Sequence, residues 1–414
     1  MTGIARLEMG QLGSDGRRAY TAVDSAGGRW QGVLDEPELV DDYLGYLDSL
    51  GRKRPVITGP KPAAITGRER SVMAGVGDTR SRAARGAPAV EPTPVPREQV
   101  GYLVATAGRA PSVHNTQPWR FHVTANALEL YADPARGLRR SDPTGREMLI
   151  SCGAALFGLR LAARRLGYAP VVQLLPSVAN RDLLARVQLG ARVRMAASEK
   201  ALLTAIARRH THRGPFSPEP LPRGMLAVLQ RDALREGATL VLPDRPGAQQ
   251  LARLVGTAER LQRADPIARA ERRRWTRRPG SAARDGVPAG GYPAVPARPR
   301  GGLALRDFDL GRGWGRLGGG GYSPATTAVL ITTGDDRADW LRAGQALHRL
   351  LLRAATGWVF ASLHTQPLEH PPLRAELRTR LGLPGAPQML LQLGRSGVAQ
   401  ATARRPVTDL LIER

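Results

Sequence analysis

Residues 109–121 are the stretch that most restricts how this 414-residue chain can fold. They read Arg-Ala-Pro-Ser-Val-His-Asn-Thr-Gln-Pro-Trp-Arg-Phe, with a proline near each end. Proline fixes φ and pushes the residue before it out of the helical region, so Pro111 and Pro118 predict a rigid, non-helical loop between them. Side chains that can hydrogen-bond to one planar ligand with carbonyls and ring nitrogens line this loop: Ser112, His114, Asn115, Thr116 and Gln117.

The polar side chains of this loop also fit a simpler interpretation. Ser and Asn often bond to nearby backbone groups in turns, so Ser112 and Asn115 can hold a tight turn that binds no ligand. From the spacing alone, the two interpretations are equally good.

The ten residues from Ala110 to Trp119 resemble a longer known motif. They are similar to the flavin-ring loop of the nitroreductase family, whose pattern is roughly A-P-S-x-x-N-x-Q-P-W. Val-His at the two free positions resembles the Acg-like subgroup of NAD(P)H nitroreductases. The resemblance implies that Ser112 and Asn115 bond the edge of a flavin ring, and that Gln117 positions the loop or the ring.

The resemblance implies that the flavin carries the chemistry, so no side chain is assigned as an essential catalytic group. His114 is the one candidate proton donor of the loop, although a packed or backbone-bonded histidine is the better interpretation. Trp119 is expected in the core at the start of a strand. Cys152 lies in an apolar helical pattern and is expected to be a small core residue.

A second polar cluster, residues 208–216, follows a helix that we expect at 199–207. Guanidinium groups bind phosphate bidentately, so several of them close together can form an anion site. Without further information, a solvated basic helix end is the better interpretation. The resemblance favours the phosphate site, because four residues fit the family pattern R-x-[ST]-x-R-x-x-F: Arg209, Thr211, Arg213 and Phe216.

The tail Arg404-Arg405-Pro406-Val407 resembles basic residues near the C-terminus of family members, which approach the flavin phosphate. Of its two arginines we choose Arg405 as the phosphate-binding residue.

The order of the two motifs differs from that of ordinary family members, in which the phosphate arm precedes the ring loop and the flavin lies at a homodimer interface. Here the phosphate arm follows the ring loop by about 90 residues. We interpret residues 96–414 as two fused nitroreductase-like halves, about 96–195 and 196–414. The resemblance implies an α+β fold, a mixed sheet flanked by helices, with one FMN site in a monomeric pseudo-dimer.

The periodicity of apolar residues predicts regular elements over most of this region. Helices are expected at 97–108, 145–166, 199–207, 249–261, 339–355 and 373–381. Strands are expected at 119–124, 127–131, 171–175, 185–189, 326–332, 358–363 and 388–393.

Residues 1–95 lie outside the resemblance and form an N-terminal extension of unknown function. A strand and a short acidic helix at 36–50 are predicted between Tyr20 and Leu50. Residues 51–96 are dominated by Gly, Pro, Ala and Arg, which predicts a linker or disordered segment.

Residues 272–302 combine a run of arginines with a Pro- and Gly-rich passage that is too polar and broken for a core. They predict a linker, a lid or a disordered segment. The resemblance favours a lid over the flavin. Residues 313–318 match G-x-G-x-x-G, but no strand leads into them and more glycines follow, so a dinucleotide site is not expected there.

The net charge of +25 suggests nucleic acid or an anionic membrane as a partner. Nearly all the basic residues are arginine, as expected from GC-rich coding, and no nucleic-acid-binding motif accompanies them. No apolar run of about 18 residues or N-terminal signal segment occurs, so we expect a cytoplasmic protein. Seven scattered histidines and one cysteine suggest no metal site and allow no intrachain disulfide.

Taken together, these features predict an FMN-dependent oxidoreductase that transfers hydride from NAD(P)H to a nitroaromatic or quinone acceptor by a ping-pong mechanism. Its partners would be small molecules, with no specific nucleic acid and no membrane. The alternative is a catalytically weak FMN-binding protein for flavin storage or redox sensing, in which the lid closes the nicotinamide site. An anion or nucleic-acid binder that acts through its arginines is the less favoured third possibility.

Overall fold

The computed structural model describes residues 94–294, 303–316, 325–396 and 402–412, and the backbone of four strands nearer the N-terminus. Contacts divide the chain into two compact units, Met1–Gly86 and Ala87–Arg414. Among the helices of these described residues, none is long and apolar enough to cross a lipid bilayer.

The first unit contains a four-stranded sheet in the order β3-β2-β1-β4. Its first three strands are antiparallel neighbours, β1 (Ile4–Leu12), β2 (Arg18–Asp24) and β3 (Arg29–Leu34). The short strand β4 (Val56–Thr58) runs parallel to β1. The predicted strand near Tyr20 corresponds to β2, whereas β4 falls where a linker or disorder was predicted. The predicted helix at 36–50 lies outside the described residues.

In the second unit, the first sheet consists of two hairpins separated by a long helix. β5 (Trp119–Val123) and β6 (Leu128–Ala132) form the first hairpin. Helix α3 (Arg146–Arg165) follows, and then β7 (Tyr168–Leu174) and β8 (Leu183–Arg192) form the second hairpin. The strand order is β5-β6-β8-β7, and all neighbours are antiparallel.

The second sheet of this unit repeats the same plan. β9 (Thr239–Val241) and β10 (Thr326–Thr332) are followed by helix α8 (Arg337–Thr356), and then by β11 (Val359–Leu363) and β12 (Ala386–Arg395). The antiparallel order β9-β10-β12-β11 matches that of the first sheet strand for strand. The α+β class that was predicted is therefore observed, with antiparallel sheets.

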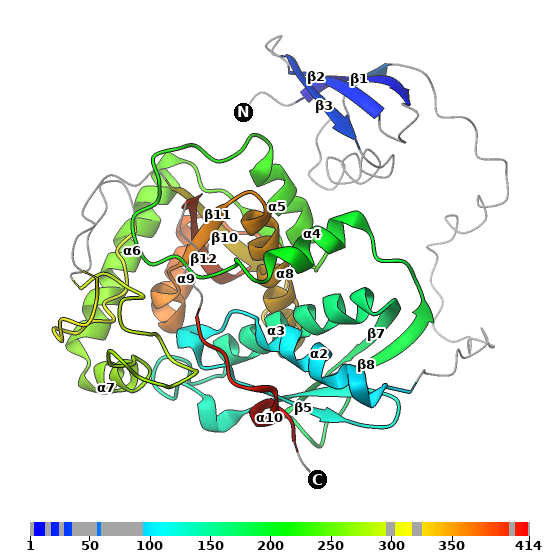
Figure 1. Cartoon of the computed structure of the whole chain (residues 1–414). Helices are drawn as coiled ribbons and strands as arrows, with labels where there is room; N and C mark the ends of the chain where they lie inside the picture. The colour runs from blue at the N-terminus through cyan, green and yellow to red at the C-terminus, as the bar shows by residue number, and fades with distance from the viewer. Residues whose placement is uncertain are drawn as a thin grey trace, which may run out of the picture. The chain divides into compact units, whose positions relative to one another are not determined.

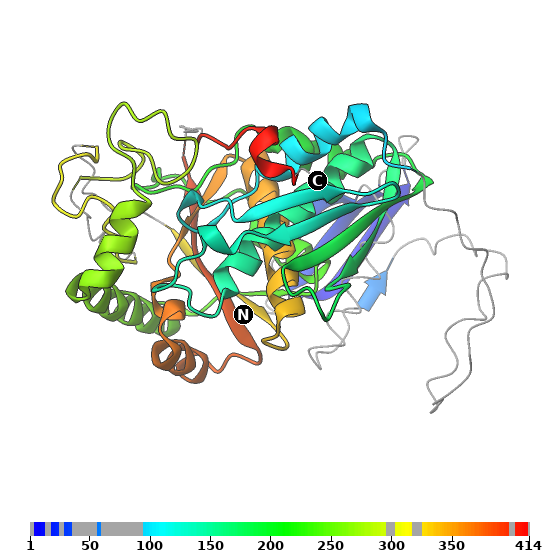
Figure 2. The same ribbon diagram turned by 90° about the horizontal axis from the view of Figure 1, so that it is seen from below.

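The two sheets are joined through their long helices, because α3 packs against α8 between them (Figures 1 and 2). A Cβ atom added at Gly153 of α3 would lie 2.2 Å from the carbonyl oxygen of Leu341. A Cβ atom added at Gly344 of α8 would lie 2.0 Å from the carbonyl oxygen of Ile150. Only glycine allows the two helix backbones to approach so closely.

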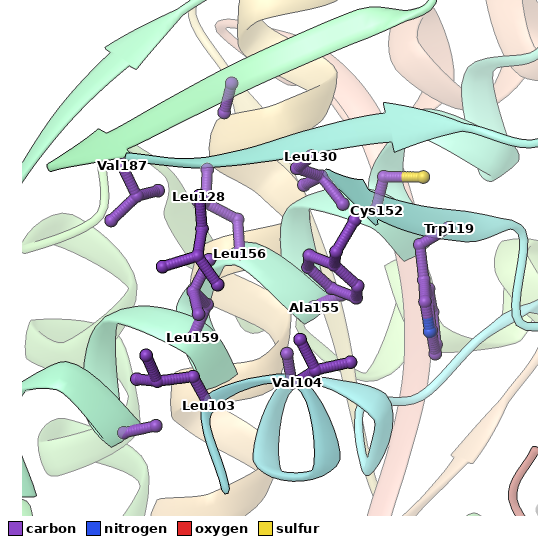
Figure 3. Close-up of a cluster of buried hydrophobic side chains, with 14 of the residues drawn as sticks. Leu103, Val104, Trp119, Leu128, Leu130, Cys152, Ala155, Leu156, Leu159 and Val187 are labelled. Carbon is purple, nitrogen blue, oxygen red and sulfur yellow. The ribbon is translucent and has the colours of Figure 1, made fainter. Parts of the chain in front are cut away.

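Each sheet has its own apolar core on the side of its long helix. Leu103 and Val104 of α2 (Arg97–Gly108) pack with Leu156 of α3 against Leu130 of the first sheet (Figure 3). Trp119, which starts β5, is fully buried in this core, as predicted. Cys152 is also buried there, and burial raises the pKa of its thiol above the usual range. The second core packs α8 and α5 (Met225–Leu234) against the second sheet.

A long insertion separates β9 from β10, where the first sheet has only a tight turn. It contains α6 (Arg245–Ala264) and α7 (Pro266–Arg274). Further short elements complete the unit: η1 (Val113–Asn115), η2 (Pro134–Arg136), α4 (Ala197–Ala205), η3 (Gln366–Glu369), α9 (Pro371–Arg380) and α10 (Val407–Leu410).

The C-terminal segment 402–412 returns to the first sheet, where α10 packs against α2 and β5 (Figure 1). Leu411 forms a parallel bridge with Phe121, and the Ile412 N–H donates to the Phe121 carbonyl oxygen at 2.8 Å. Residues 402–412 therefore lie beside the ring loop.

Every helix and strand predicted from residue 97 onward is present, with small shifts at its ends. Helices α5 and α7 and strand β9 were not predicted. The prediction that 272–302 is too polar for a core is wrong, because Trp275 is buried and Val287 and Tyr292 form a small buried apolar cluster with Phe308. A polar residue of the segment is buried as well, Arg272 in the last turn of α7. Its guanidinium pairs with Glu259 at 3.2 Å and donates to Gln262 at 2.6 Å.

Candidate functional site

A pocket lies where the ring loop, the segment after α4, the insertion and the end of β11 meet. Its empty volume is about 790 Å³, including open solvent at the mouth. Four residues that were predicted as site candidates line it: Ser112, His114, Thr211 and Arg213.

The ring loop has a strained backbone. His114, Asn115 and Gln117 have φ values of 48°, 55° and 50°, in the left-handed region that residues other than glycine seldom adopt. The Ser112 hydroxyl oxygen holds this conformation by accepting from the Gln117 N–H at 3.0 Å. The Ser151 hydroxyl oxygen accepts from the Val113 N–H at 3.2 Å. Such strain persists where surrounding contacts enforce it, and it is common at binding sites.

Asn115 ties the ring loop to the insertion and to the C-terminal segment. Its side-chain amide donates to the carbonyl oxygens of Gly286 at 3.0 Å and Ala403 at 3.2 Å. Its own carbonyl oxygen accepts from the Gly286 N–H at 3.1 Å. Both amide protons are used in these contacts, and Asn115 is not among the pocket-lining residues. The structure therefore places Asn115 behind the pocket wall.

Gln117 makes a similar set of contacts and is fully buried. Its side-chain amide donates to the Arg284 carbonyl oxygen at 2.8 Å, and its side-chain oxygen accepts from the Arg405 N–H at 2.9 Å. Gln117 thus holds three segments together, which agrees with a role in positioning the loop.

His114 is buried and lines the pocket. Its Nε2 lies 3.3 Å from a guanidinium nitrogen of Arg306. Because arginine can only donate, His114 Nε2 accepts and its proton lies on Nδ1. Burial, followed by the charge of Arg306, holds the pKa of His114 well below its usual range. His114 is therefore neutral at pH 7.

The segment after α4 is anchored on the second sheet. Thr211 forms a parallel bridge with Ala361 of β11, and the His212 N–H donates to the Ala361 carbonyl oxygen at 2.9 Å. The ring of Phe216 stacks on that of His212 at 4.5 Å. This anchoring brings Thr211 and Arg213 to the same pocket as the ring loop.

Arg209 is a buried cation with unsatisfied donors. Its Nε and Nη1 atoms have no hydrogen-bond partner among the residues that the structure describes. Burial, then the charges of Arg109 and Arg213, lower the pKa of Arg209 to about 10. Burial and Arg306 likewise lower the pKa of Arg213 to about 10. Buried cations normally have an acidic partner, so this cluster has the chemistry of an anion site.

Arg404 belongs to the same cluster. Burial lowers its pKa well below the usual range, and the next causes are the charges of Arg209, Arg109 and Arg213. Its guanidinium also donates to the Ala110 carbonyl oxygen at 3.2 Å, and its Nε has no described partner. In the remainder of this article, the "arginine cluster" means Arg109, Arg209, Arg213 and Arg404.

Arg405, the residue chosen from the sequence, points elsewhere. Its guanidinium donates to the carbonyl oxygens of Gln117 at 3.4 Å and Asp409 at 2.6 Å, and lies 4.0 Å from the Asp133 carboxylate. None of the charges that shift its pKa belongs to the arginine cluster. We therefore replace Arg405 with Arg404 as the candidate anion ligand of the tail.

The insertion forms one wall of the pocket through Pro293, Leu305, Arg306 and Phe308. It is fastened to the first half of the unit by Asp285, which pairs with Arg136, and Asp285 also pairs with Arg277 within the insertion. Of the segment predicted as a lid, 272–302, Pro293 is the one described residue that lines the pocket, because Leu305, Arg306 and Phe308 follow that segment. Residues 295–302 lie outside the described residues.

The backbone N–H groups at the start of the G-x-G-x-x-G-like stretch donate to a nearby side chain of the same chain. The Asp309 carboxylate accepts from the N–H groups of Gly313 at 2.7 Å, Trp314 at 2.7 Å and Gly315 at 2.9 Å. These N–H groups are the ones that such a loop would offer to a phosphate, which agrees with our not expecting a dinucleotide site here.

The sequence did not indicate the acidic side of the pocket. Glu147 lies in the first turn of α3, is buried and lines the pocket. Burial, followed by the charge of Glu369, raises the pKa of Glu147 to about 8. Its partners Thr365 and Arg306 come from segments about 160 to 220 residues away in the sequence. In the sequence, the feature that could have indicated Glu147 is a glutamate on an otherwise apolar face of the predicted helix at 145–166.

The sequence is similar to known proteins over most of its length. "Putative NAD(P)H nitroreductase Rv3131" of Mycobacterium tuberculosis is 36% identical over 302 residues, which is 72% of this chain and 85% of that protein. A nitroreductase family model matches residues 89–140, the region of the ring loop. The chain therefore belongs to the nitroreductase family. A further relative, "Putative NAD(P)H nitroreductase acg" of the same organism, is 28% identical over 327 residues, covering 77% and 96% of the two chains.

Among solved structures, a nitroreductase with bound FMN from Desulfitobacterium hafniense aligns with 52% of this chain and 98% of its own, at 13% identity and a TM-score of 0.30. Because the TM-score is this low, we draw no conclusion about a cofactor of the present chain from this similarity.

Proposed function

We propose that the protein is an FMN-dependent oxidoreductase that transfers hydride from NAD(P)H to a nitroaromatic or quinone acceptor in ping-pong turnover. The observation that carries the proposal is the arginine cluster, of which Arg213 lines the pocket formed by the ring loop and the segment after α4. Family membership and the names of its relatives point to the same chemistry.

The arginine cluster fits a phosphate group. Among the described residues, no carboxylate pairs with any of its four guanidiniums, and Arg209 keeps two buried nitrogens without a partner. An isolated buried cation is costly, and a dianionic phosphate monoester would supply both the charge and the hydrogen-bond acceptors. FMN carries such a group, so the residues present fit this cofactor at its phosphate end.

The loop side of the pocket fits the ring end. FMN supplies the hydride chemistry when it is bound. The Ser112 hydroxyl oxygen accepts from the Gln117 N–H, which leaves its own proton free to donate to a ligand. Asn115 and Gln117 keep this loop in its strained shape through contacts with the insertion and the tail. We therefore propose Ser112 as a ring-edge contact, and Asn115 and Gln117 as positioning residues.

We further propose that residues 96–414 are two fused halves that form a pseudo-dimer. The matching orders β5-β6-β8-β7 and β9-β10-β12-β11 support this proposal. So do the reciprocal contacts of Gly153 and Gly344, each of which lies seven residues after the first residue of its helix. The ring loop comes from one half and the phosphate arm from the other, so one chain forms one site. Sedimentation of the FMN complex should give a monomer with one FMN.

A catalytically weak FMN-binding protein is the second candidate. The observation that favours it is the way the insertion is fastened: Asn115 donates to Gly286, Gln117 donates to Arg284, and Asp285 pairs with Arg136. Access for a nicotinamide past Phe308 and Arg306 would then require these contacts to open. NADPH oxidation with a quinone separates the two candidates, since only the oxidoreductase turns over.

The first test is FMN retention after gel filtration, measured by visible absorption. We expect about one FMN per chain in the wild type and none in Arg209→Ala/Arg213→Ala. Arg164→Ala is the matched control, because Arg164 pairs with Glu199 far from the pocket. Wild-type protein that retains no FMN, or a double variant that retains it fully, would contradict the proposal.

A further inference from the structure

A second cavity lies on the other side of the acidic wall of the pocket. It is formed by the start of α3, the start of α8 and α9, and its empty volume is about 1590 Å³, including open solvent. Asp142, Arg146 and Glu369 line this second cavity, whereas Glu147 and Thr365 line the first. The same small group of side chains thus separates the two cavities.

A chain of hydrogen bonds crosses from one cavity to the other. The Thr365 hydroxyl lies 3.0 Å from a Glu369 carboxylate oxygen and 3.5 Å from a Glu147 carboxylate oxygen. Arg306 donates to the Thr365 hydroxyl oxygen at 3.2 Å, which leaves that hydroxyl proton free to be donated to either carboxylate. Glu147, Thr365 and Glu369 are therefore arranged in sequence between the two cavities.

The charges of this buried group do not balance. Three carboxyl groups, Asp142, Glu147 and Glu369, face two guanidiniums, Arg146 and Arg306. All five side chains are almost completely removed from solvent. Isolated buried charge is strongly unfavourable, so the group holds one proton among its carboxyl groups. Burial raises the pKa of both Asp142 and Glu147, which favours the protonated carboxyl that this charge count requires.

The surrounding charged and titratable groups leave that count unchanged. They are Glu259 of α6, Arg272 of α7, Arg374 of α9, Arg213 and three histidines, His114, His364 and His370. Glu259 pairs with Arg272 at 3.2 Å, and Arg374 pairs with Asp335 at 2.7 Å, so neither pair adds net charge. Arg213 lies beside Arg306 but belongs to the arginine cluster, whose charge the proposed phosphate balances. Burial lowers the pKa of all three histidines, so they are neutral at pH 7.

We propose that Glu147 donates a proton to the electron acceptor in the first cavity, and that Glu369 and Thr365 return a proton to it from the second cavity. This proposal rests on the proposed oxidoreductase function and names its proton source. It also gives a role to the second cavity, which the binding of cofactor and substrates does not use.

The proton balance of the reaction requires such a source. A quinone reduced by NAD(P)H receives a hydride equivalent, which carries two electrons and one proton. The product then has one anionic oxygen, and a second proton from the Glu147 carboxyl makes the hydroquinone. A proton from water in the second cavity then protonates the Glu369 carboxylate. Glu369 passes this proton to the Thr365 oxygen while the Thr365 hydroxyl proton moves to the Glu147 carboxylate, and the sum is NAD(P)H + quinone + H⁺ → NAD(P)⁺ + hydroquinone.

The test compares Glu147→Gln with Glu236→Gln in full-length protein loaded with FMN. Glu236 is also buried and paired with arginines, Arg160 and Arg349, but lines neither cavity. We expect Glu147→Gln to lower kcat for quinone reduction by roughly 10²- to 10⁴-fold, the usual size of general-acid catalysis. Anaerobic reduction by NADPH should stay within twofold in both variants, because that step needs no proton from Glu147.

The relay is tested at Thr365. Thr365→Val removes the hydroxyl and should lower kcat and increase its solvent deuterium isotope effect, whereas Thr365→Ser should restore both towards wild type. A merely structural role would not follow the hydroxyl in this way. Equal behaviour of the two variants would overturn the relay.

Infrared difference spectra give a readout that does not depend on turnover. We expect a protonated carboxyl band that disappears as pH rises through about 8, present in the wild type and Glu236→Gln and absent in Glu147→Gln. A wild type without this band, or Glu147→Gln with wild-type kcat, would overturn the donor role alone. A wild type that reduces no quinone at all would instead overturn the oxidoreductase function and the donor role together.

Discussion

Gly153 of α3 and Gly344 of α8 each lie against the backbone of the other's helix. The space beside Gly153 is filled by the Leu341 carbonyl and that beside Gly344 by the Ile150 carbonyl. Each carbonyl belongs to a residue four positions after the start of its helix, so the contact is symmetric. The two sheets are therefore held at a separation that only glycine at both positions permits.

Substitution at this crossing should destabilise the fold. In Gly153→Ala the new methyl group would lie 2.2 Å from the Leu341 carbonyl oxygen, which forces the helices apart. We expect a loss of about 1–3 kcal/mol in the free energy of unfolding, measured by urea denaturation. Gly101→Ala is the control, because Gly101 lies in a helix with no atom near its added Cβ. The control should gain up to ~1 kcal/mol, and equal losses in both variants would contradict the close crossing.

Arg209→Ala should affect the apo protein and the FMN complex in opposite directions. Removing a buried cation without a partner should raise the free energy of unfolding of the apo protein by about 1–3 kcal/mol. The same change should weaken FMN binding by roughly 10- to 150-fold, the loss of one charge-assisted contact. Thermal melts with and without FMN measure both effects, and an apo protein destabilised by the substitution would count against an anion site.

The two tail arginines should behave differently. Arg404→Ala should weaken FMN binding by roughly 10-fold or more, because Arg404 adds charge to the arginine cluster. Arg405→Ala should change the Kd less, because its guanidinium lies by the Asp133 carboxylate and none of the charges that shift its pKa belongs to the arginine cluster, whereas both arginines donate to backbone carbonyl oxygens. Fluorescence titration with FMN compares the two, and a larger effect at Arg405 would restore the choice made from the sequence.

Glu147 should make stability fall as pH rises. Its pKa in the folded protein is about 8, above that of an unfolded glutamate. Between these two values the folded state binds more protons than the unfolded state, so the free energy of unfolding decreases with pH. Urea denaturation at pH 5, 7 and 9 should show this decrease in the wild type and a smaller one in Glu147→Gln. A variant with the full wild-type decrease would assign the effect to another group.

Asp285 should control access to the pocket. Asp285→Ala removes the ion pair with Arg136 that fastens the insertion, together with the pair with Arg277 inside the insertion. We expect faster limited proteolysis within residues 275–294 and a higher rate of NADPH oxidation with a bulky quinone. Glu199→Ala, which breaks the distant pair with Arg164, should change neither. Unchanged proteolysis in Asp285→Ala would show that these pairs do not hold the insertion closed.

The regular elements could be predicted because their apolar residues follow helix or strand periods, as in α2 and β10. Helix α7 was missed because its sequence is rich in arginine and only Ala268 and Arg272 are buried. The start of α7 could nevertheless have been predicted from the sequence, since Asp265 caps the helix and Pro266 occupies its first turn.

The candidate site was predictable where the chemistry is local. The ring loop and the segment around Arg213 each form a short motif, and the structure brings both to one pocket. The choice between Arg404 and Arg405 was not predictable, because two adjacent arginines look alike in the sequence. Only the folded tail determines which way each side chain points. Glu147 was missed because its raised pKa comes from burial in the folded protein and then from Glu369, which is distant in the sequence.

The path of the C-terminal segment has a consequence for biosynthesis. Ala403 and Arg405 hold the ring loop through Asn115 and Gln117, and Ile412 extends the hydrogen bonding of Phe121. The ring loop leaves the ribosome almost 300 residues before these partners. A nascent chain therefore cannot complete the contacts that shape its ring loop until residues 403–412 have been synthesised.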